Sequence, residues 1–182
     1  MTHRQYFRRY RLSAAQYGEI LVAEAFRGQK LGDSQPCYDV LTSAAALVDA
    51  LHGAGVPYSA LSGPEAEVRI QVRSKLSESR SGRASVVHCK TTDLEGSKRH
   101  AAMTHLVVIL VHPGDRFDAA DGGLEGTIRR AWLIPHEAAA KLRCKKGQEK
   151  YIAVSQLAGE HPAEGVIEIT GLLASVAERE LV

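Results

Sequence analysis

EVRIQVRSKL, residues 67–76, is the most regular pattern in the chain. Its branched apolar residues at positions 68, 70 and 72 alternate with polar residues. Since successive side chains of a β-strand point to opposite faces of a sheet, the alternation separates an apolar face from a polar one. We therefore expect a strand over residues 67–76, with Val72 pointing into the core and Gln71 and Arg73 pointing away from it.

Helical and strand patterns alternate on both sides of this strand. Ser13 is a favourable N-cap with a glutamine three residues later, a spacing that predicts a helix over residues 14–27. The stretch 77–83 is rich in Ser, Gly and Arg and is typical of a turn, so we expect a hairpin between residues 67–76 and a strand over 84–90. The other expected elements are strands over 37–41, 106–112, 127–134 and 151–155, and helices over 43–52, 136–143 and 172–181.

This mixture of helices and strands predicts an α/β fold around one central sheet. At 182 residues the chain is long enough for one domain with a substantial core. We expect that domain over residues 13–182, with a small helical insertion over about residues 43–66 after the first core strand. Residues 1–12 are expected to form a basic N-terminal arm, because five of them are His or Arg and none is acidic.

The composition indicates a protein of a reducing compartment. Its three cysteines are widely spaced and odd in number, which argues against a disulfide framework. The longest apolar run, residues 106–111, is too short to cross a bilayer, and no apolar segment typical of a secretory signal follows the charged N-terminus. We therefore expect a cytoplasmic protein without a membrane partner.

Positive charge is gathered in patches, although the net charge of the chain is only +2. One patch follows the polar face of residues 67–76 and the turn behind it: Arg69, Arg73, Lys75, Arg80 and Arg83. Such a patch can form a footprint for DNA phosphates, in which case its last four members are the expected contacts. The alternative is an ordinary solvated surface.

Hydrolysis of a phosphodiester bond with a divalent metal needs acidic oxygens around the metal and a cation near the phosphate. Residues two apart on a strand share a face, so an acid-x-Lys triplet directs both side chains towards one metal. In this chain Gln71 and Arg73 occupy such a pair of positions, and Asp39 lies in the short strand expected over residues 37–41.

Short motifs in this order resemble the PD-(D/E)XK superfamily of restriction-endonuclease-like nucleases. They are Gly18-Glu19 in the opening helix, Tyr38-Asp39-Val40, and Ile70-Gln71-Val72-Arg73-Ser74-Lys75. The third motif is similar to small members that read Gln-Val-Lys instead of Glu-x-Lys, and residues 131–135 are similar to their last core strand running into a helix. The resemblance covers about residues 13–143 and implies a restriction-endonuclease-like mixed sheet flanked by helices.

The resemblance also implies a metal site. Asp39 matches the family's invariant metal-binding aspartate, Gln71 matches its second ligand, and Glu19 matches a helix glutamate that many members add. The ion expected there is Mg²⁺ or Mn²⁺. Arg73 stands where the family has lysine; because arginine keeps its proton at neutral pH, it can bind phosphate but cannot act as a base. Glutamine in place of glutamate removes one negative charge, which weakens metal binding.

Two lysines are candidates for the missing ammonium group. Lys75 shares the face of Arg73, about 6.8 Å further along the strand, and Lys90 ends the strand expected over 84–90. For each lysine the alternative is a solvated edge residue. The candidate catalytic residues are therefore Asp39, Gln71, Arg73 and Lys75.

Three functions stay open at this level. The first is a metal-dependent DNA endonuclease, favoured by the intact Asp39 and Glu19. The second, favoured by the Gln-x-Arg triplet, is an inactive nuclease-fold protein that binds DNA or assembles, as a homodimer or in a larger complex, within a defence or repair system. The third is an interaction protein with no nucleic-acid role.

Overall fold

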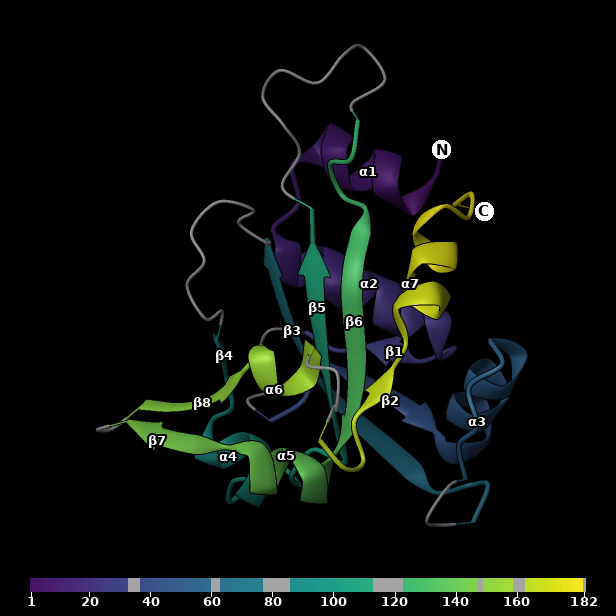
Figure 1. Ribbon diagram of the computed structural model, residues 1–182. Helices are drawn as coiled ribbons and strands as arrows, with labels where there is room; N and C mark the ends of the chain where they lie inside the picture. The colour runs from purple at the N-terminus through teal and green to yellow at the C-terminus, as the bar shows by residue number, and fades with distance from the viewer. Residues whose placement is uncertain are drawn as a thin grey trace.

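A computed structural model gives the fold and describes residues 1–32, 37–59, 63–76, 86–112, 123–146, 149–158 and 163–181. Within these residues the main sheet has six strands in the order β1-β2-β3-β5-β6-β9, and a second sheet has the order β4-β8-β7 (Figure 1). The main sheet consists of β1 (Gln29–Lys30), β2 (Val40–Ser43), β3 (Glu67–Leu76), β5 (His105–Val111), β6 (Ile128–Pro135) and β9 (Ile167–Glu168). The second sheet consists of β4 (Val86–His88), β7 (Cys144–Lys146) and β8 (Glu149–Ala153).

β3 lies in the middle of the main sheet and makes it mixed. It is antiparallel to β2, with Ile70 opposite Val40, and parallel to β5, with Ile70 opposite His105. The expected α/β class and mixed central sheet are therefore confirmed. The expected hairpin between residues 67–76 and 84–90 is wrong, because β4 pairs with β8 in the second sheet. The turn predicted over 77–83 lies outside the described residues.

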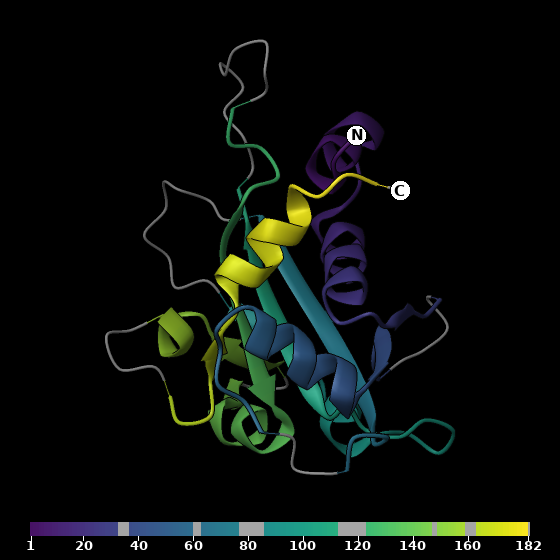
Figure 2. The same ribbon diagram turned by 90° about the vertical axis from the view of Figure 1, so that its right-hand side faces the viewer.

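Helices cover both faces of the main sheet (Figures 1 and 2). On one side lie α1 (His3–Tyr10), α2 (Ala14–Ala25), α3 (Ala44–Gly53) and α7 (Thr170–Ala177). On the other side the second sheet lies with α4 (Thr91–Glu95), α5 (His136–Leu142) and α6 (Ser155–Ala158). In the described part of the chain, no helix has both the length and the apolar character needed to cross a bilayer.

Two apolar cores result, one on each face of the sheet. The first contains Val68, Ile70 and Val72, with α2 packed on β3 and α7 on β6, so the inward orientation of Val72 is confirmed. The second lies between the opposite face of β5 and β6 and the layer made by α5 and the second sheet. That layer also covers the polar face of β3, and Gln71 is only 2% exposed. Gln71 therefore points away from the core that holds Val72, as expected, but it is buried under the second layer.

The opening helix approaches the sheet closely at Gly18. A Cβ atom at this position would lie 1.8 Å from Oγ of Ser74 on β3. A side chain at this position would force Ser74 to move, so glycine permits the close approach of α2 to β3. The predicted start of this helix is confirmed, because the Ser13 side chain accepts from Gln16 N at 3.2 Å.

The first residues do not form a free arm. Thr2 caps α1 through Gln5, and Phe7 stacks on Tyr17 of α2 with ring centroids 4.4 Å apart. Arg4 forms an ion pair of 3.0 Å with Glu178 beyond α7. The sequence prediction of a basic arm over residues 1–12 is thus corrected to a docked helix, stabilised by burial of Phe7.

Candidate metal and DNA site on strand β3

Asp39 and Gln71 are in direct contact. Asp39 immediately precedes β2, and its backbone N–H donates to the carbonyl of Ile70 at 2.8 Å. This pairing sets Asp39 beside Gln71, whose amide Nε2 donates to Asp39 Oδ2. The backbone N–H of Val72 donates to the same oxygen at 2.7 Å. The strand predicted over residues 37–41 thus begins later, at Val40, and Asp39 occupies its entrance.

The surroundings of Asp39 oppose its negative charge. Burial raises the pKa of its carboxyl to about 6, with further increases from the charges of Glu19 and Asp93. The hydrogen bond from Val72 N and the charge of Arg73 act in the opposite direction and lower this pKa. Desolvation is the largest of these effects, as expected for a carboxyl group removed from water. A cation bound here would meet a carboxylate whose negative charge is only partly balanced by the Val72 N–H and Arg73.

Glu19 approaches from α2 but already has a partner. Its Oε2 lies 3.0 Å from Nζ of Lys30 on β1, and its side chain is 16% exposed. Its charge still contributes to the raised pKa of Asp39. The three predicted metal ligands therefore fall into a contacting pair, Asp39 and Gln71, and a nearby carboxylate that is ion-paired to lysine.

Arg73 is held by the layer that covers β3. Its Nη2 lies 2.8 Å from Oδ2 of Asp93, a residue with no exposed surface, and its Nε donates to the carbonyl of His88 at 3.0 Å. The backbone N–H of Lys90 donates to the same Asp93 oxygen at 2.8 Å. Arg73 therefore joins β3 to the β4–α4 connection, and its positive charge is paired with a buried carboxylate.

Asp93 is the site residue that sequence reasoning missed. Its partner Arg73 lies twenty residues earlier in the chain, so no local pattern connects the two. One available signal was the spacing of Lys90 and Asp93, because an acidic residue three positions after a helix N-cap binds the cap's backbone N–H. That spacing indicates a helix start, and α4 was absent from the expected elements.

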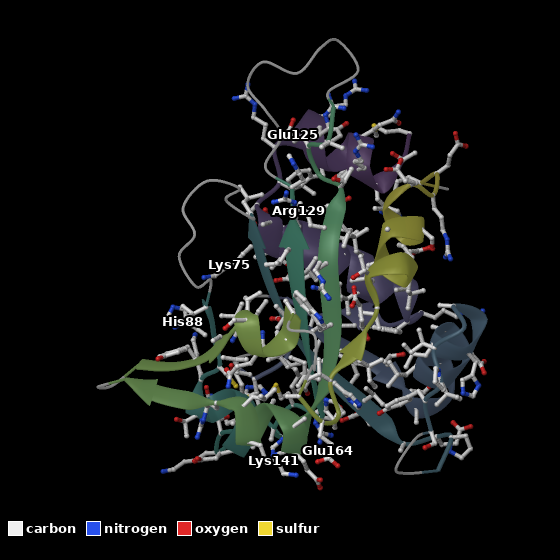
Figure 3. The ribbon with its side chains drawn as sticks, viewed as in Figure 1. Lys75, His88, Glu125, Arg129, Lys141 and Glu164 are labelled. Carbon is white, nitrogen blue, oxygen red and sulfur yellow. The ribbon has the colours of Figure 1, made fainter. Side chains whose placement is uncertain are left out.

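The two candidate lysines are placed differently from Arg73. Lys75 is partly exposed, and among the described residues no ion-pair partner is found for it. It lies on the same flank of the molecule as His88 (Figure 3). Lys90 is exposed and caps α4. Arg80 and Arg83 lie outside the described residues.

The donor set at Asp39 fits a hard cation. A carboxylate, a primary amide and the neighbouring Glu19 carboxylate offer oxygen ligands of the kind that Mg²⁺ and Mn²⁺ prefer. Among the residues that the structure describes, no group of three or more His, Cys, Asp or Glu side chains is arranged to hold a metal. Binding would therefore depend on the Gln71 oxygen, on release of Glu19 from Lys30, or on both.

Comparison with known proteins does not give the chain a family. No protein-family model matches the sequence, and no curated protein is similar to it. The mixed six-stranded sheet flanked by helices is the level at which the fold is established. A restriction-endonuclease-like fold and the site roles that come with it stay predictions.

Proposed function

We propose that the protein is a metal-dependent endonuclease of the PD-(D/E)XK type that hydrolyses DNA phosphodiester bonds at a site built on Asp39 and Gln71. The contact between these two side chains supports the proposal, because it joins the matched aspartate and the matched second ligand across neighbouring strands. The raised pKa of Asp39, about 6, adds that its carboxylate lacks a strong internal cation. Both features are expected of a carboxylate that is a ligand to a bound metal ion.

Each residue then has a distinct task. Asp39 and Gln71 would hold Mg²⁺ or Mn²⁺, with Glu19 as a further ligand on release from Lys30. An ion held there would supply positive charge beside the scissile phosphate and the attacking water. Lys75 attracts the DNA backbone, because its ammonium group has no ion-pair partner among the described residues. Arg73 positions β3 against Asp93 and does not serve as the ammonium group.

A second function is favoured by the Arg73–Asp93 ion pair. This pair neutralises the cation that stands where the family has its lysine, and it leaves the site without an ammonium group at that position. An inactive nuclease-fold protein that binds DNA, as a homodimer or as a subunit of a defence or repair complex, would have this arrangement. A cytoplasmic location suits both functions, because the two cysteines with described side chains, Cys37 and Cys89, are buried free thiols.

Nicking of supercoiled plasmid with Mg²⁺ or Mn²⁺ tests the proposal. We expect weak nicking by the wild-type protein that disappears in Asp39→Ala and is kept in Asp49→Ala, a matched control at an exposed aspartate of α3. Nicking that persists in Asp39→Ala would show that the active site lies elsewhere or that a contaminant is responsible.

Three further variants separate the candidate cations. If Lys75 or Lys90 supplies the ammonium group, Lys75→Ala or Lys90→Ala abolishes nicking and Arg73→Lys is neutral or harmful. If Arg73 only replaces the family's lysine, Arg73→Lys raises nicking. Absence of nicking in the wild type and every variant, with DNA binding retained, supports the inactive DNA-binding protein instead.

A further inference from the structure

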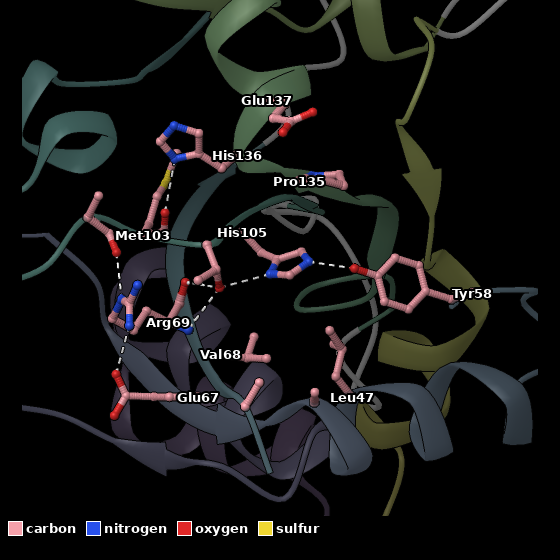
Figure 4. Close-up of a pocket in the computed structure, with 14 residues that line it drawn as sticks. Leu47, Tyr58, Glu67, Val68, Arg69, Met103, His105, Pro135, His136 and Glu137 are labelled. Atoms are coloured by element: carbon pink, nitrogen blue, oxygen red, sulfur yellow. Dashed lines mark hydrogen bonds and ion pairs between the residues drawn. The ribbon is translucent and has the colours of Figure 1, made fainter. Parts of the chain in front are cut away.

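A cavity of about 410 Å³ opens at the end of the sheet where β3 and β5 begin (Figure 4). Its walls come from α3, from the first residues of β3, from the segment before β5 and from the junction of β6 with α5. Most of this lining is apolar, with Leu47, Val68 and Met103 among the buried members. The cavity lies within the size range of small-molecule sites in proteins.

Tyr58 and His105 are among the polar residues of the lining. The hydroxyl of Tyr58 lies 2.7 Å from Nε2 of His105, which is 8% exposed. The backbone carbonyl of Tyr58 is in turn 2.8 Å from Nε2 of His52 on α3, which fixes the position of the tyrosine. Figure 4 shows the hydroxyl of Tyr58 directed at the ring of His105.

The hydrogen-bond chain behind Tyr58 sets the direction of its proton. The hydroxyl of Thr104 donates its single hydrogen to the carbonyl of Arg69 at 3.0 Å and accepts from the N–H of Arg69 at 2.9 Å. With that hydrogen on the Arg69 carbonyl, the remaining lone pair of Thr104 accepts from Nδ1 of His105, 2.9 Å away, in the tautomer that carries hydrogen on Nδ1. A neutral imidazole with hydrogen on Nδ1 has a bare Nε2, so Tyr58 donates to it.

This direction determines what the cavity offers to a ligand. Because the only hydrogen of the Tyr58 hydroxyl is given to His105, its oxygen presents lone pairs alone. Burial lowers the pKa of His105 to about 4 and raises that of Tyr58, so both side chains are uncharged at neutral pH. The group placed against Tyr58 must therefore be a hydrogen-bond donor.

Charges at the edge of the cavity disfavour anions. Arg69 is committed to two partners, since its Nε donates to the carbonyl of Ala102 at 2.6 Å and its Nη1 lies 2.8 Å from Glu67. Glu137 adds a second carboxylate at the edge and is exposed. The charged side chains that line the cavity thus sum to one negative charge, with one Arg against two Glu.

We propose that this cavity binds a small molecule with an apolar body, one N–H or O–H donor directed at Tyr58, and no negative charge. The apolar body is accommodated by the lining of Leu47, Val68 and Met103. The proposal does not rest on the nuclease function, because it involves neither Asp39 nor Gln71.

Indole and benzofuran are matched probes, because the two have nearly the same shape and only indole has an N–H donor. In NMR titrations of the full chain, we expect indole to shift the resonances of residues that line the cavity. We expect indole to bind at least about fivefold more tightly than benzofuran, the effect of one neutral hydrogen bond. Indole-3-carboxylate should bind more weakly than indole, because of its charge.

Two variants locate the binding. Ala102→Trp fills the cavity from its partly exposed edge and should abolish indole binding. Tyr58→Phe removes the acceptor oxygen at which the donor is directed and should bring the affinities for indole and benzofuran closer together. Tyr10→Phe, at an exposed tyrosine of α1, is the control and should change neither affinity. Circular dichroism and thermal unfolding of each variant check that it folds.

Several results would overturn the proposal. In the wild type, these are the absence of NMR shifts with millimolar indole, equal affinity for indole and benzofuran, or tighter binding of indole-3-carboxylate than of indole. Indole binding by a folded Ala102→Trp variant would also contradict the proposal.

Discussion

The guanidinium of Arg73 lies 2.8 Å from a carboxylate oxygen of Asp93, and Asp93 has no exposed surface. The contact joins the centre of the main sheet to the layer that covers it. Burial raises the pKa of Asp93, while the charge of Arg73 and the backbone N–H of Lys90 act to lower it. Arg73 is therefore the main group that makes an ionised carboxylate tolerable at this depth.

Removal of one partner from this pair should cost more stability than removal of both. We expect Arg73→Met to lower the free energy of unfolding by about 3 kcal/mol, because it leaves the Asp93 charge buried and unpaired. With Asp93→Asn added, part of that loss should return, for a coupling energy of about 1–3 kcal/mol in urea unfolding.

The Arg130–Glu168 pair is the comparison for this double-mutant cycle. Its side chains are 37% and 49% exposed, so the same cycle there should give less than about 1 kcal/mol. Purely additive effects at Arg73 and Asp93 would show that the ion pair does not stabilise the fold.

The raised pKa of Asp39 predicts how stability depends on pH. The folded protein holds this proton up to about pH 6, whereas the unfolded chain loses it near 3.8. The contribution of Asp39 to stability therefore falls as pH rises from about 4 to about 6, and stays low at higher pH. Asp39→Asn should stabilise the protein at pH 8, in the absence of divalent metal, by up to about 3 kcal/mol, and should have little effect near pH 4.

Thermal or urea unfolding at several pH values measures this difference. Asp49→Asn, at an exposed aspartate of α3, is the control for the loss of a carboxylate. Added Mn²⁺ should stabilise the wild type more than Asp39→Asn. Equal stabilisation of the two proteins by Mn²⁺ would remove Asp39 from the metal site.

Lys75 is expected to contact a DNA phosphate. DNA binding releases about one counterion for each phosphate contact. Without the contact of Lys75, the slope of log K against log salt should be smaller by about 0.9 in Lys75→Ala. Lys141→Ala is the control, because Lys141 lies on α5 at a distant part of the surface (Figure 3). Arg80→Ala and Arg83→Ala should each reduce the slope by about the same amount. A slope that Lys75→Ala leaves unchanged would assign this lysine to ordinary solvated surface.

The tautomer of His105 is a direct prediction of its hydrogen bonds. Nitrogen-15 spectra should show hydrogen on Nδ1, since Thr104 accepts from this atom. The ring should stay neutral down to about pH 4, because burial lowers its pKa. Hydrogen on Nε2 would reverse the bond to Tyr58 and would make the cavity prefer a hydrogen-bond acceptor.

Several elements could be predicted because their signals are local. β3 has the predicted bounds, since alternation over ten residues specifies both the strand and its inward face. The capping box at Ser13 gives the start of α2, and the helix predicted from residue 136 begins there, at His136. The pairing of Asp39 with Gln71 also agrees with the order of the motifs, although their contact depends on the register between β2 and β3.

Other features depend on partners that are distant in the chain. The alternation in β3 predicted a polar face, but it did not show that a second layer covers this face and buries Gln71. Asp93 became part of the site only through this layer, which brings it to Arg73. The cavity at Tyr58 likewise joins five segments that are separated in the sequence.

The sequence by itself determined the α/β class, the central strand with Val72 inside, and the positions of Asp39 and Gln71 as candidate ligands. Alternation and capping act within a few residues, so they are readable without knowledge of the fold. Only the tertiary structure decided that β4 pairs with β8, that Gln71 is buried and that Arg73 is neutralised by Asp93. Strand partners and buried charge pairs are chosen by packing between distant segments, and side-chain periodicity along one strand carries no information about which segment will cover it.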